Sequence, residues 1–458
     1  MRSRVPKVLH PIAGRSLIDH VLDALSGAGV DRSVVVTGHG ADRVELAVAD
    51  RATTARQEPQ LGTADAVRVG LTAVPDDVST VLVTMGDAPL QPIDLYRAIL
   101  SEREVGEPAI VLVSAHLSDA TGYGRVVRGR DGGATAIVEE PDLDDATRVI
   151  GEINVGTYAF DGPWLRAALA RVGAATTGEQ YLTDLIALAV ADGRAVRVVE
   201  AGDAADMIGI NDRVALATAE ERMRRRIVEH HLRNGVTIVD PATTRIDAGV
   251  EIGQDARIEP WSILEGATVI AQDAVIGPNA HVRDSRIGPR TRVWASVIEE
   301  STVAEDVEIG PFAHLRPGSE IGARCRIGNF AEIKKSRVGA GTQQHHFSYL
   351  GDAEIGENVN VGAGSVTANF DGTDKHRTII GDGASIGVDT MMVAPVTIGA
   401  GATTGAGSVV TRDVAPGKKV VGVPARPIEM KRRSQSPVEP GEPSAGEAPV
   451  PTGADRNP

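Results

Sequence analysis

Three polar positions have a residue type and a setting that could support chemistry. The first is Asp87, which directly follows the largely apolar residues 78–85, a run that predicts a buried strand. Open α/β sheets bind ligands at the carboxyl ends of their strands, and a carboxylate there suits Mg²⁺, which takes oxygen ligands and usually bridges phosphates. From this motif alone, a metal ligand and a helix-capping or turn aspartate are equally good interpretations.

The other two positions are Lys7 and His346. Lys7 is the only lysine before residue 334, and it precedes an apolar helical pattern, where its ammonium could meet a triphosphate. His346 follows His345, and a histidine can take the proton of an amine that attacks a thioester. An exposed surface lysine and an exposed loop histidine are the commoner cases. The interpretation of both residues therefore depends on the secondary-structure elements around them.

The first half of the chain, about 200 residues, alternates strand-like runs with helix-like segments. Residues 33–38, 78–87 and 108–116 predict buried strands, and the segments between them carry apolar residues at helical spacing. Such alternation predicts a mostly parallel, Rossmann-like α/β sheet with helices on both faces. Residues 122–140 predict a hairpin within this sheet, and residues 57–66 predict a loop leading into a helix, whose free N–H groups suit a nucleotide.

A single predicted helix, residues 212–235, connects the two halves. Asn211 or Asp212 can cap its start, and Gly235 ends it. Beyond this helix the apolar residues recur with a period of six. They form two unbroken runs, the second after a slip of one residue: Ile246, Ile252, Ile258, Leu264, Ile270, Ile276 and Val282, then Val303, Ile309, Leu315, Ile321, Ile327 and Ile333.

This six-residue apolar repeat is typical of a parallel β-helix, in which each short strand sends one aliphatic side chain inward and three strands close a triangular coil. In known hexapeptide-repeat proteins the coil is left-handed, against the usual crossover preference. Two segments interrupt the repeat, residues 339–352 and 367–378. Insertions into a solenoid become loops on one face, often the binding face. We therefore expect both segments, the first of which contains His346, to lie at a site.

The bulk composition limits the class of protein. A chain of 458 residues is long enough for two or three domains. With 47 basic and 62 acidic residues, its net charge of -15 argues against a general nucleic-acid or membrane binder. The single cysteine, Cys325, excludes an internal disulfide, and no run of 18 apolar residues or signal-like segment occurs, so we expect a cytoplasmic protein.

The order of eight motifs resembles one family. The motifs are PKVLHPIAG, QLGTADA, GDAPL, TGYGRV, IVEE, EINVGTY, GEQYLTDLI and IGINDRVAL. They resemble the bifunctional N-acetylglucosamine-1-phosphate uridyltransferase/glucosamine-1-phosphate acetyltransferase of bacterial cell-wall (peptidoglycan) precursor synthesis, over residues 1 to about 425. The resemblance implies acetyl transfer from acetyl-CoA to glucosamine 1-phosphate, then uridyl transfer from UTP to N-acetylglucosamine 1-phosphate with release of pyrophosphate. It also implies a homotrimer with sites between neighbouring prisms.

The same resemblance assigns roles to individual residues. In the first half it implies Mg²⁺ ligands at Asp87 and Asn211, and contacts to UTP or the sugar nucleotide at Lys7, Gln57, Gly62, Thr63, Gly124, Glu139, Asn154 and Asn211. In the second half His346 matches the catalytic base, and Arg316, Lys334, Tyr349 and Asn360 match the sugar-phosphate contacts. The acetyl-CoA contacts match Ala363, Asn369, Phe370, Val388 and Ala406. The family often has Tyr at the position of Phe370 and has Ser at that of Val388.

The resemblance implies a nucleotidyltransferase domain (residues 1–211), a linker helix (212–235) and a left-handed β-helix acetyltransferase domain (236–431), followed by a Pro- and Gly-rich tail (432–458) that is expected to be disordered. Members of the family carry a strand and a Gly-rich nucleotide loop before the PKVLH motif, and Met1 aligns with the Met that closes that loop. We therefore expect the true start to lie upstream. Otherwise uridyl transfer should be severely impaired, and the alternative function is acetyl transfer alone.

Two further classes of protein fit parts of the sequence. A β-helix metalloenzyme of the γ-carbonic anhydrase type binds zinc through three histidines at subunit interfaces, and His281, His314 and His346 all lie in the repeat region. The Arg-Pro-Gly motif at 316–318 and the Lys-Lys motif at 334–335 suit a phosphate better. The second class is a trimeric scaffold without chemistry, and the density of matched polar motifs argues against it.

Overall fold

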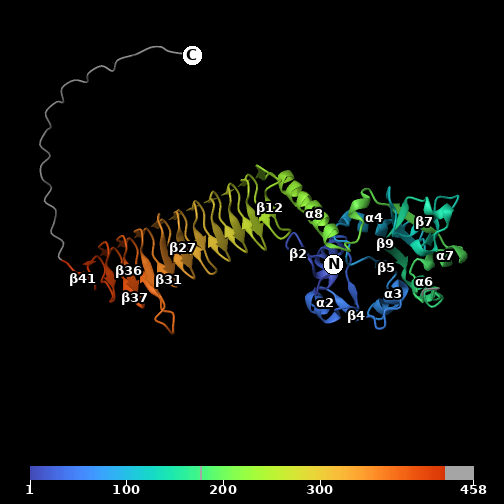
Figure 1. The fold of residues 1–458 in the computed structure, drawn as a ribbon, viewed down its shortest axis with the longest axis horizontal. Coiled ribbons are helices and arrows are strands. Elements are labelled where there is room, and N and C mark those ends of the chain that lie inside the picture. Colours follow the sequence, from blue (N-terminus) through green and yellow to red (C-terminus); the bar gives the residue numbers. More distant parts are fainter. Residues whose placement is uncertain (176–177, 429–458) are drawn as a thin grey trace, which may run out of the picture.

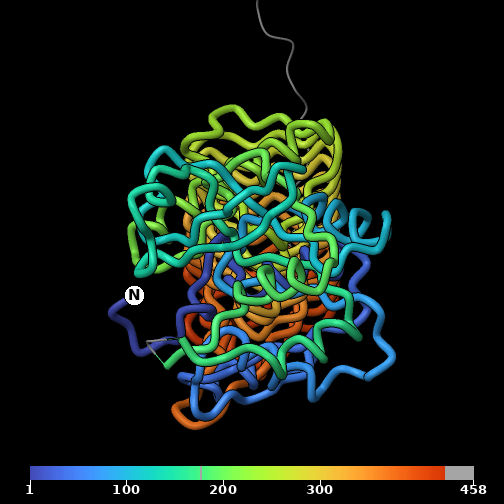
Figure 2. Tube along the Cα trace, turned by 90° about the vertical axis from the view of Figure 1, so that its right-hand side faces the viewer, coloured from blue at the N-terminus to red at the C-terminus, as the bar shows by residue number. Residues whose placement is uncertain are grey.

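The computed structural model describes residues 1–175 and 178–428. It consists of an N-terminal α/β body and a long three-sided prism, joined by the helix α8 (Arg213–Arg233) (Figure 1). Figure 2, seen from the end that carries the N-terminal body, shows the coils of the prism lying behind that body. No described helix is both long and apolar enough to cross a membrane. The predicted disordered tail, residues 432–458, lies outside the described residues.

The N-terminal body is built on a six-stranded sheet. Its strands in spatial order are β10 (Val196–Glu200), β6 (Ile110–His116), β9 (Glu152–Asp161), β7 (Arg125–Arg128) and β8 (Ala134–Val138), with β5 (Thr80–Val83) also paired to β9. The sheet is mixed and not mostly parallel, because β9 runs antiparallel to β5, β6 and β7. The predicted hairpin is present as β7 and β8.

Helices cover both faces of this sheet, as predicted. They are α1 (Leu17–Gly27), α3 (Thr63–Leu71), α4 (Ile93–Glu104), α5 (Asp145–Arg148), α6 (Gly162–Leu169) and α7 (Asp184–Ala191). Helix α2 (Ala41–Val48) instead packs beside a separate two-stranded sheet. Alternate residues of β6 point to opposite sides. Ile110 and Leu112 pack in the core formed with α3, α6 and α7, whereas Val111 and Val113 pack in the core formed with α1 and α4.

A second, two-stranded sheet lies beside α2. It consists of β3 (Val34–Thr37) and β4 (Thr53–Arg56), which run parallel. In the described part of the chain β3 pairs only with β4, and β5 pairs only with β9. The three strands predicted from apolar runs are therefore present as β3, β5 and β6, and they belong to two separate sheets.

Helix α8 contributes to the cores of both halves. The Asp212 side chain caps its start by accepting a hydrogen bond from Ala215 N at 2.8 Å. Gly235 follows its end with φ 88°, a left-handed conformation that glycine adopts without strain. Ala219 packs against the N-terminal body, and Val228 packs in the core of the prism. The two halves are thus joined through one helix that packs against both.

The prism has three faces, each an almost entirely parallel sheet of strands from successive coils. The first face has twelve strands and begins at β11 (Thr237–Ile238), the second has ten and begins at β12 (Arg245–Ile246), and the third has nine and begins at β13 (Glu251–Ile252). The second face contains β24 (His314–Leu315), β27 (Ala331–Lys334), β30 (Ser348–Gly351) and β33 (Val366–Ala368), and the first contains β29 (Gln343–Gln344) and β32 (Asn360–Val361).

The predicted six-residue repeat supplies the core of the prism. Every predicted aliphatic position belongs to one hydrophobic cluster or packs against it. Between the two predicted runs the cluster continues through Ile287, Val293 and Ile298, which a strict six-residue template misses because some steps are five residues long. The left-handed sense of the coil stays a prediction.

The two interruptions of the repeat differ in kind. Residues 367–378 include a loop between β33 and β34 (Thr378–Ile380) that projects from the prism (Figure 1). The prediction that residues 339–352 are an inserted loop is wrong, because β29 and β30 continue the first and second faces. The pattern breaks there because the buried, inward position of β29 is occupied by Gln344 and not by an aliphatic residue.

Candidate active sites

In the N-terminal body, three predicted residues meet beyond the end of β5. The Lys7 ammonium donates hydrogen bonds to the Asp87 carboxylate and, at 2.9 Å, to Asn211 Oδ1. The Asp87 residue is 8 % exposed, and its backbone oxygen accepts a hydrogen bond from Ile210 N at 2.9 Å. This backbone bond ties the loop after β5 to the segment before α8, and it therefore holds Asp87 and Asn211 side by side.

The donor set around Lys7 fits the predicted Mg²⁺. Asp87 offers carboxylate oxygens and Asn211 an amide oxygen, and both are bonded to one ammonium group, so the structure already accommodates a cation between them. In the part of the chain that the structure describes, no group of three or more His, Cys, Asp or Glu side chains is arranged to hold a metal. A Mg²⁺ bound by these two residues would take its other oxygen ligands from water and phosphate.

A second group in the same body contains Gly124, Glu139 and Asn154. Asn154 N donates a hydrogen bond to Gly124 O at 2.9 Å, and a Cβ on Gly124 would lie 3.2 Å from Glu139 Oε2. Glu139 accepts a hydrogen bond from Thr183 Oγ1 at 2.8 Å, while burial raises the pKa of its carboxyl above the usual range. Thr183 was not among the predicted residues, although it lies within the GEQYLTDLI motif.

The remaining predicted residues of this half hold the loop before α3. Gln57 Nε2 donates to Gly62 O at 3.0 Å, and Thr63 Oγ1 accepts a hydrogen bond from Leu182 N at 2.9 Å. Gly62 has φ 116°, and a Cβ there would lie 2.5 Å from Gln180 O, so only glycine fits. These residues fix the loop at the start of α3, and their contact with UTP stays a prediction.

On the prism, the predicted phosphate ligands come together on the second face. Arg316, Lys334 and Tyr349 lie on or directly after β24, β27 and β30, which are successive neighbours in that sheet. Tyr349 pairs in register with Glu332, and Glu332 Oε1 accepts a hydrogen bond from Arg316 Nη1 at 2.8 Å. The register of parallel strands therefore brings residues from three successive coils into one patch.

Lys375 joins this patch, and the sequence prediction missed it. It lies on the projecting loop, and its ammonium lowers the pKa of Lys334; burial and the Arg316 guanidinium act in the same direction, and Asp352 opposes them. Positive charges that lower the pKa of Lys334 in this way are stabilised by an anion placed among them. The patch formed by Arg316, Lys334 and Lys375 therefore suits a phosphate. The available signal was a lysine in a repeat-breaking segment of a lysine-poor chain.

His346 lies in the turn between β29 and β30, at the corner where the first and second faces meet. Its backbone oxygen accepts a hydrogen bond from Ser348 Oγ at 2.8 Å. Its exposed ring makes no hydrogen bond within the described residues, whereas His345 bonds through Nε2 to Gln343 Oε1 at 2.7 Å. The His346 imidazole is thus free to accept a proton, three residues before Tyr349 of the cationic patch.

Most of the predicted acetyl-CoA contacts lie at the same corner, on later coils. Backbone hydrogen bonds of 2.7–2.8 Å join successive turns of this corner. In chain order the stacked turns carry His346, Ala363, Val388 and Ala406. Asn360, a predicted sugar contact, lies on β32 beside Gln343 of β29. The alignment of these turns along the prism fits an elongated ligand, although contact with acetyl-CoA stays a prediction.

The other two predicted acetyl-CoA contacts hold the base of the projecting loop. The Asn369 side chain donates to the Asp352 carboxylate, and its backbone oxygen accepts a hydrogen bond from His376 N at 2.8 Å. Phe370 pairs with Lys375 in an antiparallel bridge. These contacts orient the segment that carries Lys375 toward the cationic patch.

Two of the three histidines of the zinc alternative bond to carboxylates. His281 bonds to Glu265 Oε2 at 2.8 Å and His314 bonds to Glu299 Oε2 at 3.0 Å, both on the second face. Each of these histidines therefore has a carboxylate partner of its own.

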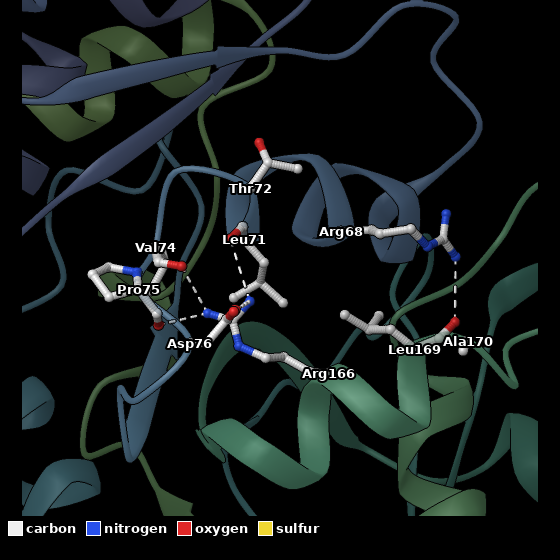
Figure 3. Close-up of a pocket in the computed structure, with 9 residues that line it drawn as sticks. All are labelled: Arg68, Leu71, Thr72, Val74, Pro75, Asp76, Arg166, Leu169 and Ala170. Atoms are coloured by element: carbon white, nitrogen blue, oxygen red, sulfur yellow. Dashed lines mark hydrogen bonds and ion pairs between the residues drawn. The ribbon is translucent and has the colours of Figure 1, made fainter.

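A cavity of about 430 Å³ lies between α3 and α6 (Figure 3). Arg166 donates hydrogen bonds there to the backbone oxygens of Leu71, Val74 and Pro75, at 2.7–3.3 Å. It thereby satisfies carbonyl groups at and beyond the carboxyl end of α3. None of the predicted site residues lines this cavity, and its arginine has a structural task.

Comparison with known proteins agrees with both halves of the chain. Residues 2–207 match the nucleotidyl transferase family, and residues 300–335 match the bacterial transferase hexapeptide (six repeats) family. The chain is 45% identical over 429 residues to the bifunctional protein GlmU of Geobacillus thermodenitrificans, with 93% of each chain covered. It is 44% identical to the bifunctional protein GlmU of Mycolicibacterium vanbaalenii, with 94% of this chain and 89% of that protein covered. The resemblance seen in the motifs is confirmed, and the chain belongs to the GlmU family of bifunctional proteins.

Proposed function

We propose that this chain makes UDP-N-acetylglucosamine in two steps at two separate sites. The prism transfers an acetyl group from acetyl-CoA to glucosamine 1-phosphate, and the N-terminal body then transfers uridylate from UTP to N-acetylglucosamine 1-phosphate. One observation supports this proposal. In a chain related to GlmU proteins over both halves, the motif residues of the N-terminal body lie together, and so do those of the prism. The product is a precursor of the bacterial cell wall, and the proposed location is the cytoplasm.

In the acetyl transfer, the amine nitrogen of glucosamine 1-phosphate attacks the thioester carbon of acetyl-CoA. His346 takes the amine proton, the carbon–sulfur bond breaks, and coenzyme A leaves as the thiol after protonation. Arg316, Lys334 and Lys375 hold the phosphate of the sugar, which places the amine near the His346 corner. Because the imidazole has no hydrogen-bond partner within the described residues, it is available as the base.

In the uridyl transfer, a phosphate oxygen of N-acetylglucosamine 1-phosphate attacks the α-phosphorus of UTP and pyrophosphate leaves. Lys7 supplies positive charge to the phosphates, and Gly124, Glu139 and Asn154 border the sugar. Asp87 and Asn211 would hold Mg²⁺, which would neutralise charge on the phosphate oxygens. The residues of this site belong to the proposed domain 1–211, which α8 separates from the prism domain, residues 236–431.

Two assays on one preparation of the purified protein test the proposal. Acetyl transfer is followed by release of the coenzyme A thiol, and uridyl transfer is followed by release of pyrophosphate. Both products should form, each only with its own substrates. Thiol release without pyrophosphate release would favour the alternative of an acetyltransferase alone, and the absence of both would refute the proposal.

A homotrimer is part of this proposal, and an exposed aromatic row supports it. Along the prism corner that carries His346, the strand register aligns Phe347 with Phe330 and Phe330 with Phe312. These three side chains are 57–61 % exposed, and the rings of Phe312 and Phe330 stack with centroids 5.4 Å apart. A row of exposed aromatic rings is typical of an interface, so burial between neighbouring prisms explains it.

The double substitution Phe312→Ser and Phe330→Ser is expected to dissociate the trimer. Each exposed ring that is buried between copies stabilises the assembly through its apolar area, and serine removes that contribution. Light scattering after gel filtration should give the mass of three chains for the wild type and of one chain for the variant. Acetyl transfer should fall with dissociation while uridyl transfer persists, and an undissociated variant would contradict the proposed interface.

The proposed role of Lys375 predicts a specific defect in substrate binding. Lys375→Ala should raise the KM for glucosamine 1-phosphate by about tenfold to a hundredfold, because a charge-assisted hydrogen bond to phosphate is lost. The KM for acetyl-CoA should stay unchanged. Lys335→Ala is the matched control, because this exposed lysine follows Lys334 in sequence and forms no part of the patch. Equal effects of the two substitutions would contradict the assignment.

A further inference from the structure

One polar side chain lies inside the aliphatic core of the prism, next to the turn of His346. Gln344 is 0 % exposed and occupies the inward position of β29, where the preceding coils of the same face place Ile309 and Ile327. Its Oε1 has no hydrogen-bond partner in the described part of the chain. A buried unpaired polar atom costs about 1–3 kcal/mol, so an aliphatic residue would serve the core better. Packing alone does not account for a glutamine at this position.

The amide nitrogen of Gln344 begins a chain of two hydrogen bonds that ends at His346. Gln344 Nε2 donates to Ser348 Oγ at 2.8 Å, and Ser348 Oγ donates to the backbone oxygen of His346 at 2.8 Å. An amide N–H can only donate, so the Ser348 oxygen must accept from Gln344. The single hydroxyl proton of Ser348 is thereby committed to His346, and the bond fixes the orientation of the His346 carbonyl.

Backbone contacts between coils also hold the turn that carries His346, including a hydrogen bond of 2.7 Å from Gly364 N to Phe347 O. The imidazole makes no hydrogen bond within the described residues, so its place depends on the backbone that carries it. On the preceding coil, Gly328 lies so close to this turn that an added Cβ would meet His345 O at 1.9 Å. The backbone is therefore held by Gly328 on one side and by the bonds from Gln344 and Ser348 on the other.

We propose that Gln344 is a positioning residue for acetyl transfer, which acts through Ser348 to hold the turn of His346 in the geometry that proton transfer needs. This inference rests on the proposed role of His346 as the base. It explains why the prism keeps an amide in its apolar core at the one coil that carries this histidine. Gln344 lies inside the prism and does not touch either substrate.

The test is the substitution Gln344→Met, which keeps the length of the side chain and removes its donor. We expect kcat of acetyl transfer to fall by about tenfold to a hundredfold, the range that small misplacements of reacting groups produce. The KM values for glucosamine 1-phosphate and acetyl-CoA should change less than twofold. The Tm should stay equal or rise, because an apolar side chain replaces a buried amide. A role in stability alone would lower Tm and leave kcat unchanged.

Further variants show whether the chain of hydrogen bonds carries the effect. Ser348→Ala should lower kcat as Gln344→Met does, the double variant should be no slower than either, and Ser348→Thr should restore most of the rate because it keeps the hydroxyl. Ile309→Val, two coils away on the same face, is the control for a general change of the core and should leave kcat unchanged. If Gln344→Met does not fold, the kcat values of Ser348→Ala and Ser348→Thr test the inference in its place.

Two results separate the failure of this inference from the failure of the proposed function. Unchanged kcat in Gln344→Met and in Ser348→Ala, together with loss of activity in His346→Ala, would overturn the inference and leave His346 as the base. Full acetyl transfer in His346→Ala would overturn the proposed base itself. Losses that multiply in the double variant would show that Gln344 and Ser348 act independently, against the inference.

Discussion

Replacement of His346 by alanine is expected to lower kcat of acetyl transfer by about 10²–10⁴-fold, the contribution typical of a positioned general base. The KM for glucosamine 1-phosphate should change little, because Arg316, Lys334 and Lys375 bind its phosphate. Uridyl transfer by the same protein should keep its full rate, since that site lies in the N-terminal body. Thiol release and pyrophosphate release, measured on one preparation, check both expectations.

His345→Ala is the matched control for this substitution. The two rings are neighbours, but the His345 ring bonds to Gln343, whereas the His346 ring makes no hydrogen bond within the described residues. We expect His345→Ala to retain most of the acetyl transfer. The assignment fails if His345→Ala is the more damaging change, or if His346→Ala abolishes both activities in a trimer that is still folded.

Replacement of Asp87 by alanine is expected to lower kcat of uridyl transfer by about 10²–10³-fold, the loss typical when one group that stabilises transition-state charge is removed. The substitution removes the carboxylate that bonds to Lys7 and that offers oxygens to Mg²⁺. Acetyl transfer should be unaffected. Removal of divalent cations with EDTA should have the same selective effect, and added Mg²⁺ should reverse it.

Asp94→Ala is the control for Asp87→Ala. Asp94 lies in the first turn of α4, and its side chain is 90% exposed in an ion pair with Arg97. Its loss should change neither activity, because an exposed ion pair contributes little to stability. Pyrophosphate release that persists in Asp87→Ala, or that is indifferent to EDTA, would contradict the proposed cation site.

The sequence predicted the architecture of the prism well, apart from the segment of Gln344. Inward positions such as Ile258 and Leu315 were predicted correctly, because a solenoid repeats one local rule at every coil. Gln344 is a polar residue at an inward position, so its segment was mistaken for an insertion. A search for periodic apolar residues does not recognise a position where a buried polar side chain forms a hydrogen bond. Lys375 was missed for a related reason: its partner Lys334 lies on another coil, and only the fold brings the two together.

In the N-terminal body the apolar runs of β3, β5 and β6 were predicted from the sequence, but their pairing was not. The position of β9 between β6 on one edge and β5 and β7 on the other depends on long-range contacts, and it makes the sheet mixed. The motif residues were assigned as candidates from the resemblance, and their meeting in space is a property of the chain path. The ammonium of Lys7, for example, reaches Asp87 and Asn211 only because the loop after β5 is bonded to the segment before α8.

The sequence by itself determined the division into an alternating α/β half and a six-residue repeat, together with the residue types available for each reaction. These are local properties, since periodicity and motif order follow directly from neighbouring positions in the chain. The tertiary structure alone decided which cations face one another, which histidine keeps a free ring, and why an amide sits in an aliphatic core. Those outcomes depend on distances between residues remote in sequence, and the distances are set by packing and strand register.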